Sequence, residues 1–394
     1  MAAPPELVDD AMEEIFLRLP PAEPAHLVRA ALVCRRWRRI LTGGAFVRRY
    51  RAFHGAAPLL GFLDNTIDLH GARAPRFSPT SSASPFHRGP FDCICWDVLD
   101  CRHGRVLLGL FAGRVNLVVW DPVTGHHQAL PDPGLLPGYY SAAVLCGTAR
   151  GGCGCDNLHC CRDGGGPFRV VLAGMESMDY FARGEDAGVR ARLYCSEAAA
   201  WVASAHLPSN SHVMRKPSAV VGDDVYFQLM SAYVILRYDT ARNRLSTFDP
   251  PPAHADEGGI VLMPMDGEDG DGSSQLGLAG VRGSRLCLRS TSVGAEGEGI
   301  AGWVRRGDIE LMTRIPFLPY SEAQVIASAE GLGTIFFFVS TEVGLFAIDF
   351  KSGQERKVSE PGNYNNFTVF PFMSFYTPGL GEAGEQKQLS VVCS

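Results

Sequence analysis

Six cysteine and histidine side chains crowd one glycine-rich stretch, where they could bind a metal ion: Cys146, Cys153, Cys155, His159, Cys160 and Cys161. These are the ligand types that Zn²⁺ prefers, and four of them suffice for a tetrahedral site. However, the adjacent pair Cys160-Cys161 and the Cys-x-Cys spacing do not form a standard knuckle, and no second cluster repeats them. The pattern favours an exposed thiol loop, with a zinc site as the alternative, and we expect no cofactor.

Two further motifs resemble ligand sites only in their letters. The acidic stretch Asp266–Gly272 lacks the bidentate Glu that a calcium loop needs at its twelfth position, where Gly277 or Gly280 stands. The glycine spacing at Gly297, Gly299 and Gly302 is followed by a strand-like segment, so no helix N-terminus would receive a phosphate. No nucleophile or metal-protease motif is present, and we expect a protein that is not an enzyme.

The charge is unevenly distributed along the 394 residues. Residues 1–55 hold nine Arg and six acidic residues, which gives +3, while the whole chain carries −6. Neither part is basic enough for a dedicated nucleic-acid binder. The start of the chain lacks the pattern of a secretory signal, and no run of about 18 apolar residues predicts a membrane span. We therefore expect 12 reduced cysteines and a cytoplasmic or nuclear location.

Helical periodicity is confined to the first fifty-odd residues. Apolar residues recur at helical spacing over 6–19, and two prolines at 20 and 21 end that pattern. Two further apolar stripes and a basic segment, 45–54, predict three or four short helices. Such a small module buries little surface alone, so it should dock on a partner or, alternatively, cap the domain that follows.

The same residues resemble an F-box. The likeness rests on Pro5–Val8, Glu14–Pro20, Leu27–Arg29 and, most specifically, Leu32–Arg38. It departs from the common pattern at Ala3 and Pro4, where a Leu usually precedes the first Pro. The resemblance implies binding to the Skp-type adaptor of a cullin–RING ubiquitin ligase. Carried over by position, it implies these adaptor-facing residues: Pro5, Leu7, Ile15, Leu19, Pro20, Leu27, Val33, Cys34 and Trp37. Trp37 could also fill the core of the module.

From about residue 57 the pattern changes to short apolar runs bounded by turn residues. A nine-residue unit recurs three times, at Leu117–Gly125, Ile235–Asn243 and Leu345–Gly353. In each unit an apolar strand ends at an Asp, and Gly or Asn follows four residues later. Asp can accept backbone N–H groups and Gly or Asn can adopt a left-handed conformation, so each unit predicts a hairpin turn.

A second unit, marked by Trp201 and Trp303, alternates with the first. Five hairpins then suggest repeated four-stranded blades, and a sixth could form if Leu59–Leu63 or Thr66–Leu69 pairs near Phe367–Phe375. We predict an α+β multidomain chain: an all-α F-box in 1–55, an all-β propeller of about six blades in 56–378, and a tail in 379–394. A large sandwich or barrel is the competing fold.

The body also resembles the kelch-like propellers that follow F-boxes in plants, especially grasses, through Asp100–Leu108 and the Asp-Pro-x-Thr-Gly turn. The two resemblances together imply a substrate receptor of an SCF-type ubiquitin ligase. In it the head would bind the adaptor, and through it a cullin, while the propeller would bind a protein target. The alternatives are a propeller enzyme or small-ligand binder with a helical cap, and a scaffold that turns over no target.

Overall fold

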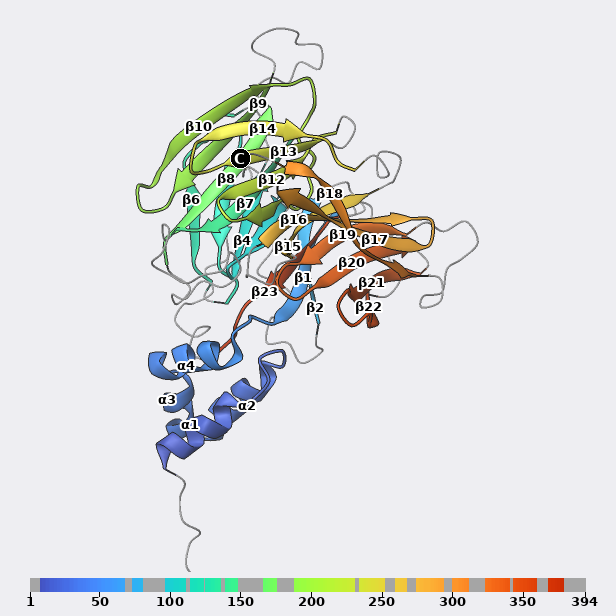
Figure 1. Cartoon of the computed structure of the whole chain (residues 1–394). Coiled ribbons are helices and arrows are strands. Elements are labelled where there is room, and N and C mark those ends of the chain that lie inside the picture. Colours follow the sequence, from blue (N-terminus) through green and yellow to red (C-terminus); the bar gives the residue numbers. More distant parts are fainter. Residues whose placement is uncertain are drawn as a thin grey trace, which may run out of the picture.

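The computed structural model describes residues 8–67, 73–80, 96–110, 114–123, 125–135, 139–147, 166–175, 188–230, 234–251, 259–267, 274–293, 300–311, 323–340, 343–359 and 368–378. Within them four helices precede a body of strands, and Figure 1 shows the helices as a head beside one end of that body. This confirms the predicted fold class. Among the helices described, none is long and apolar enough to cross a lipid bilayer.

Four short helices form the head, residues 8–54. They are α1 (Asp9–Leu17), α2 (Ala25–Val33), α3 (Arg35–Leu41) and α4 (Gly44–His54). The first turn of α1 contains Asp9 and Asp10, where the positive end of the helix dipole favours carboxylates. The chain breaks between α2 and α3 because Cys34 is extended, and its sulfur accepts the Trp37 backbone N–H at 3.5 Å.

The body contains five four-stranded antiparallel sheets and one sheet in which the described residues supply three strands. The first two four-stranded blades are β3 (Trp96–Arg102), β4 (Arg105–Leu110), β5 (Asn116–Trp120), β6 (His127–Leu130), and β7 (Tyr140–Cys146), β8 (Phe168–Met175), β9 (Gly188–Cys195), β10 (Ala200–Pro208). The third is β11 (Ala219–Val221), β12 (Asp224–Gln228), β13 (Ile235–Asp239), β14 (Arg244–Phe248). The last two are β15 (Ile260–Asp266), β16 (Ser274–Arg282), β17 (Arg285–Val293), β18 (Ile300–Glu310), and β19 (Gln324–Ala329), β20 (Thr334–Ser340), β21 (Gly344–Asp349), β22 (Glu355–Ser359).

The sixth blade joins the two ends of the body. Here β1 (Leu59–Ile67) lies between β2 (Arg73–Pro79) and β23 (Val369–Met373), and it is antiparallel to both. The pairing expected between the first and last strand-like segments is therefore confirmed. One strand of each blade, namely β3, β7, β11, β15, β19 and β23, borders its neighbours around the centre. The result is a closed six-bladed β-propeller, in which the described blades present their unpaired strand edges on the outside of the ring.

The three repeated Asp units form the turns that their sequence predicts. Asp239 Oδ1 accepts the backbone N–H groups of Ala241 and Arg242, both at 2.9 Å, and Asn243 has φ 49°. Asp349 accepts two backbone N–H groups in the same way, and Gly353 has φ 68°. Each unit thus links the third and fourth strands of its blade.

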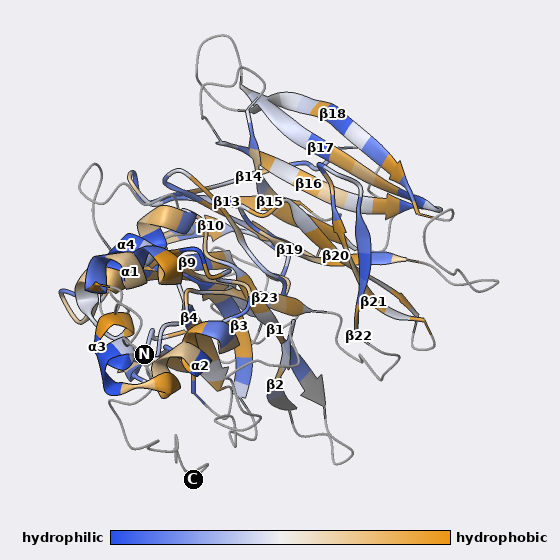
Figure 2. Ribbon diagram, turned by 90° about the horizontal axis from the view of Figure 1, so that it is seen from below, coloured by the Kyte–Doolittle hydropathy of each residue, from blue (hydrophilic) through white to orange (hydrophobic). Residues whose placement is uncertain are grey.

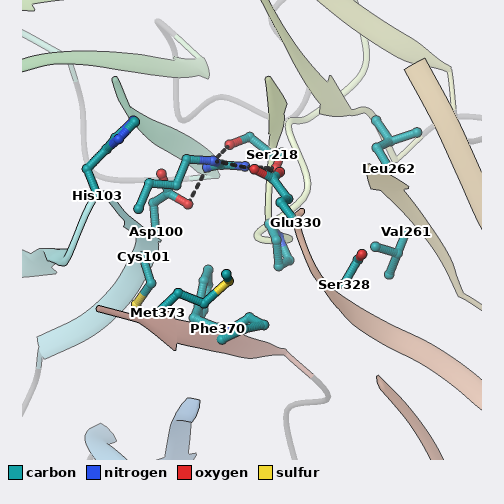
Figure 3. A pocket seen from close by; sticks show the side chains of 13 residues that line it. Asp100, Cys101, His103, Ser218, Val261, Leu262, Ser328, Glu330, Phe370 and Met373 are labelled. Carbon is teal, nitrogen blue, oxygen red and sulfur yellow. Dashed lines mark hydrogen bonds and ion pairs between the residues drawn. The ribbon is translucent and has the colours of Figure 1, made fainter. Parts of the chain in front are cut away.

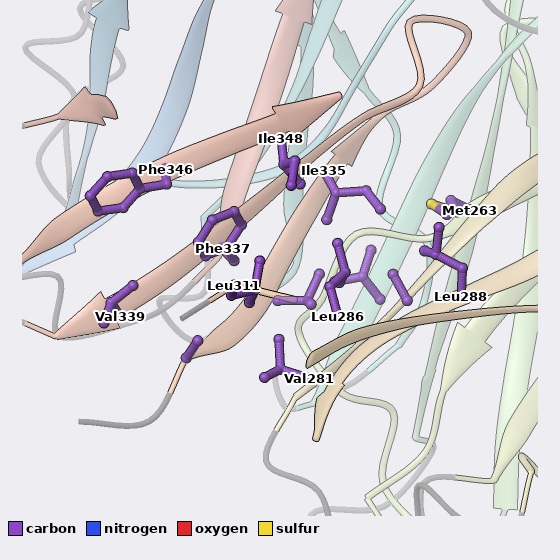
Figure 4. Packing of buried hydrophobic residues seen from close by; sticks show 14 of the residues in the cluster. Met263, Val281, Leu286, Leu288, Leu311, Ile335, Phe337, Val339, Phe346 and Ile348 are labelled. Carbon is purple, nitrogen blue, oxygen red and sulfur yellow. The ribbon is translucent and has the colours of Figure 1, made fainter. Parts of the chain in front are cut away.

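Apolar side chains fill the space between neighbouring blades. Figure 4 shows this packing between β15–β18 and β19–β22, where Leu286, Ile335 and Phe337 have no exposed surface. Phe337 stacks on Phe346 with ring centroids 5.9 Å apart. Such contacts hold the blades in fixed positions, because each buried side chain of this size contributes about 1.5–3 kcal/mol.

The head is joined to the propeller by packing as well as by the chain. Phe375, just beyond β23, is 8% exposed and belongs to the same apolar cluster as the helices. Its ring meets Tyr50 of α4 edge-on, with centroids 6.1 Å apart. The adjacent Ser374 lies against the β3–β4 turn, where a Cβ on Gly104 would come within 3.0 Å of its hydroxyl. The head therefore sits at the end of the propeller where β23 and β3 finish.

Candidate functional site: the helical head and the propeller channel

The head has an aromatic core of its own. Phe16 of α1 meets Trp37 of α3 and Phe46 of α4, with ring centroids 5.2 and 6.5 Å apart, and Phe46 stacks on Tyr50. The Tyr50 hydroxyl donates to the carbonyl of Leu19 at 2.8 Å, which fixes the chain just beyond α1. Trp37 is only partly buried there, so its ring supports the core and still offers an accessible edge.

Arginines of α3 and α4 tie these helices to α1. Arg36 Nε lies 2.7 Å from Asp9, and Arg49 contacts both Glu13 and Glu14. These pairs explain part of the basic cluster as internal bonding rather than as a phosphate site. Because they are exposed, each contributes about 0–1 kcal/mol at most.

Exposed apolar side chains are concentrated on the head. In the part of the chain that the structure describes, eight large hydrophobic residues are exposed, and five of them belong to the head: Val8, Ile15, Leu32, Val33 and Phe53. Val8 directly precedes α1, and Ile15 lies within that helix. Seen from the end that carries the head, the helices show apolar and charged stretches side by side (Figure 2). So much exposed apolar surface on so small a module is characteristic of a binding surface.

The residues expected to face an adaptor differ in their accessibility. Ile15, Pro20, Val33 and Cys34 are exposed, and Leu19 and Trp37 are half-buried against the core of the head. Leu27 differs from the expectation, because its side chain is 1% exposed and packs inside the head. Pro5 and Leu7 lie outside the described residues.

A buried ionic cluster lines a small cavity between the inner strands of the propeller, at the end near the head (Figure 3). Arg102, at the end of β3, donates to Asp100 beside it and, through Nη2, to Glu330 Oε1 at 2.6 Å. Its Nη2 also donates to the carbonyl of Ser218 at 2.5 Å, and Asp100 Oδ2 accepts the backbone N–H of Val144 at 2.7 Å. Four blades meet in this one cluster.

Burial and charge compete within the cluster. Burial raises the pKa of Asp100 and of Glu330, and the neighbouring Arg102 acts in the opposite direction. Burial also disfavours the charge of Arg102, but Asp100 and Glu330 outweigh that effect and raise the pKa of the guanidinium. Sequence reasoning did not find this site, because Glu330 is 228 residues from Arg102 in the chain and meets it only when the ring closes.

The motifs considered in the sequence do not assemble into a site within the described residues. Cys146 is buried at the end of β7, and the other members of its cluster (Cys153, Cys155, His159, Cys160 and Cys161) lie outside the described residues. Asp266 is exposed and pairs with Lys351 at 3.1 Å. Among the residues described, no group of three or more His, Cys, Asp or Glu side chains is arranged to hold a metal ion.

Comparison with known proteins identifies the head. Residues 5–47 match the model of the F-box domain. No curated protein matches the chain.

Solved structures resemble the body only weakly. An acylaminoacyl peptidase from Pyrococcus horikoshii is 10% identical, covers 76% of this chain and 53% of its own, and has a TM-score of 0.37. A prolyl endopeptidase is 11% identical, covers 89% of this chain and 40% of its own, with a TM-score of 0.33. The six-bladed lectin of Aleuria aurantia is 13% identical, covers 75% and 90%, and has a TM-score of 0.38. This chain thus spans less than two thirds of either peptidase, and the low scores carry no argument about activity. The family match and the sheet topology together establish a chain with an N-terminal F-box domain in front of a six-bladed β-propeller.

Proposed function

We propose that this protein is a substrate-recognition subunit of an SCF-type cullin–RING ubiquitin ligase. F-box domains bind Skp-type adaptors, and the combination with a propeller fits such a receptor. The observation that carries the proposal is the exposed apolar surface of the head, because Ile15 and Val33 are 47% and 63% exposed within an F-box. The chain would then work where adaptor and cullin do, in the cytoplasm or nucleus.

In this proposal the head binds and the propeller selects, and no residue of the chain performs chemistry. The adaptor surface would comprise Ile15, Val33 and Cys34, with the accessible edge of Trp37 as an aromatic anchor. Leu27 would support this surface from inside the head. We also propose that the propeller is of the kelch-like kind that follows F-boxes in grasses.

The direct test is co-purification of the full chain with a Skp-type adaptor. Val33→Asp and Ile15→Asp place a charge in the proposed interface without touching the core, and each should weaken adaptor binding at least tenfold. Phe53→Asp is the matched control, because Phe53 is 55% exposed on the same head but lies outside the proposed surface. Unchanged binding by folded Val33→Asp and Ile15→Asp variants would refute the assigned face.

A receptor and a scaffold can be separated by the fate of bound partners. If the propeller presents a target for ubiquitination, proteins captured on it should accumulate when the proteasome is inhibited. A scaffold would show the same partners at the same level with and without the inhibitor.

A further inference from the structure

A second cavity lies between the inner strands of the propeller, at the mouth away from the head. It has a volume of about 140 Å³. Its lining includes the first residues of inner strands, such as Asp97 and Tyr140, and Thr368 just before β23. Because β23 runs from this mouth toward the head, the cavity opens on the opposite side of the propeller. It has several times the room that one water needs.

Two adjacent cations, Arg215 and Lys216, lie in the wall of this cavity. Their backbone is held from two other blades, because Ser141 donates to the carbonyl of Lys216 at 2.8 Å and Thr368 donates to that of Arg215 at 3.3 Å. Arg215 also lies over the Tyr140 ring, 5.8 Å from its centroid. The segment before β11 is therefore fixed in place before any ligand arrives.

The net charge of the wall is positive. Arg215 Nη1 pairs with Asp97 Oδ2 at 3.1 Å, and that carboxylate is 2% exposed while the Arg215 side chain is 33% exposed. The guanidinium thus lies on the accessible side of the pair. Lys216 Nζ donates to the carbonyl of Ile260 at 3.3 Å, and among the described residues no carboxylate pairs with it.

The buried ammonium group is incompletely compensated. Burial lowers the pKa of Lys216 to about 8, since a carbonyl alone does not replace an anionic partner. Burial also raises the pKa of Tyr140, whose ring is 1% exposed and forms part of the wall. A negatively charged oxygen in the cavity would lie against a wall that contains both Arg215 and Lys216.

We propose that this cavity binds a carboxylate group, held by Lys216 and Arg215. The carboxylate could belong to a small organic acid or to an acidic side chain of a bound protein. The second source rests on the proposed function and would make the cavity part of the target-binding face. Binding of the carboxylate itself does not depend on that function.

Exposed apolar residues lie beside the cavity. Tyr139, next to Tyr140, is 44% exposed and meets the His212 ring edge-on at 4.9 Å. The backbone carbonyl of His212 accepts the backbone N–H of Met230, whose side chain is 48% exposed. A peptide probe should therefore carry an apolar residue next to its acid.

The test is saturation-transfer NMR on the full chain with three probes: sodium acetate, N-acetyl-leucyl-glutamyl-alanine amide, and the same peptide with glutamine. Acetate or the glutamate peptide should bind saturably, and the glutamine peptide at least tenfold more weakly. Lys216→Met should weaken carboxylate binding at least tenfold. Lys351→Met is the control, because Lys351 is an exposed lysine outside the cavity and its loss should change nothing.

The relative affinities identify the source of the carboxylate. Tighter binding of the glutamate peptide than of acetate indicates a protein-borne acid, and equal or tighter binding of acetate indicates a small organic acid. The proposal is overturned if neither probe binds saturably, if glutamine replaces glutamate without loss, or if folded Lys216→Met binds as before. Co-purification of Lys216→Met with the adaptor should be unaffected, so a failure here stays distinguishable from a failure of the F-box assignment.

Discussion

Replacing Arg102 by Met tests whether the buried ionic cluster holds the propeller together. The side chains of Arg102, Asp100 and Glu330 are only 5%, 4% and 9% exposed. Met keeps much of the apolar stem but leaves two buried carboxylates without their cation. Removing one partner of a buried ion pair costs about 3–5 kcal/mol, and here one change affects two pairs. We expect Arg102→Met to lower the free energy of unfolding at pH 7 by at least that amount.

The pH dependence of this loss follows from the carboxylates. Without Arg102, the pKa values of Asp100 and Glu330 should rise further in the folded state, because burial already raises both. A carboxyl group whose pKa is raised by folding takes up its proton more readily in the folded than in the unfolded protein. Lowering the pH from 7 to 5 should therefore reduce the deficit of the variant.

Urea unfolding followed by tryptophan fluorescence measures both effects, since four of the five tryptophans lie in the propeller. Arg285→Met is the control, because Arg285 pairs with Glu310 at 3.0 Å but is 65% exposed, and its loss should cost less than about 1 kcal/mol. The triple variant Arg102→Met, Asp100→Asn, Glu330→Gln should recover most of the stability. A deficit below about 1 kcal/mol, or one equal at pH 7 and pH 5, would contradict this reasoning.

Three further predictions concern single side chains. Lys216→Met should stabilise the protein by up to about 3 kcal/mol at pH 7, because the lysine pKa is about 8 in the folded protein and 10.5 in the unfolded protein. Measured by urea unfolding, the free energy of unfolding of the wild type should rise toward that of the variant as the pH increases from about 8 to 10.5. Asp349→Ala should cost about 1–2 kcal/mol at neutral pH through lost turn hydrogen bonds, and because bonding to Ser352 lowers the pKa of Asp349, the deficit should shrink as the pH falls below 3.8. Phe375→Ala should destabilise the packing between head and propeller by about 3 kcal/mol. Amide hydrogen exchange should become faster in α4 while the inner strands of the propeller stay protected. Unchanged protection of α4 in the variant would show that the Phe375 ring does not hold the head in place.

Local patterns predicted the hairpins because their causes are local. The Asp of each repeated unit bonds to N–H groups two or three residues away, and the Gly or Asn that follows supplies the left-handed turn residue. The closing partner of the first strand was also predictable, since the last apolar run had no other unpaired neighbour. Helical spacing likewise located α1, and the expected basic helix over 45–54 corresponds to α4.

Features that depend on the closed ring were not predictable from spacing. Arg102 meets Glu330 across the channel, and the cavity beside Lys216 is assembled from several blades. Within the head, periodicity could not tell which apolar residues face inward. The side chain of Leu27 is buried in the core of the head, whereas that of Val33 is exposed at the end of α2. There the extended Cys34 ends the helix, and α3 packs back against α1.

The joint at Phe375 sets an order of events during synthesis. β1 emerges early but must wait for β23, which lies near the far end of the described chain, before the sixth blade can form. Phe375 comes two residues after β23, so the contact that fixes the head is made by residues translated after all the strands that the structure describes. Pairings between such distant segments form late, because the whole intervening chain must first be brought together. A chain that stops before residue 375 would lack the contact between Phe375 and Tyr50 that holds the head. The F-box domain is therefore fixed against the propeller only after the sixth blade can form.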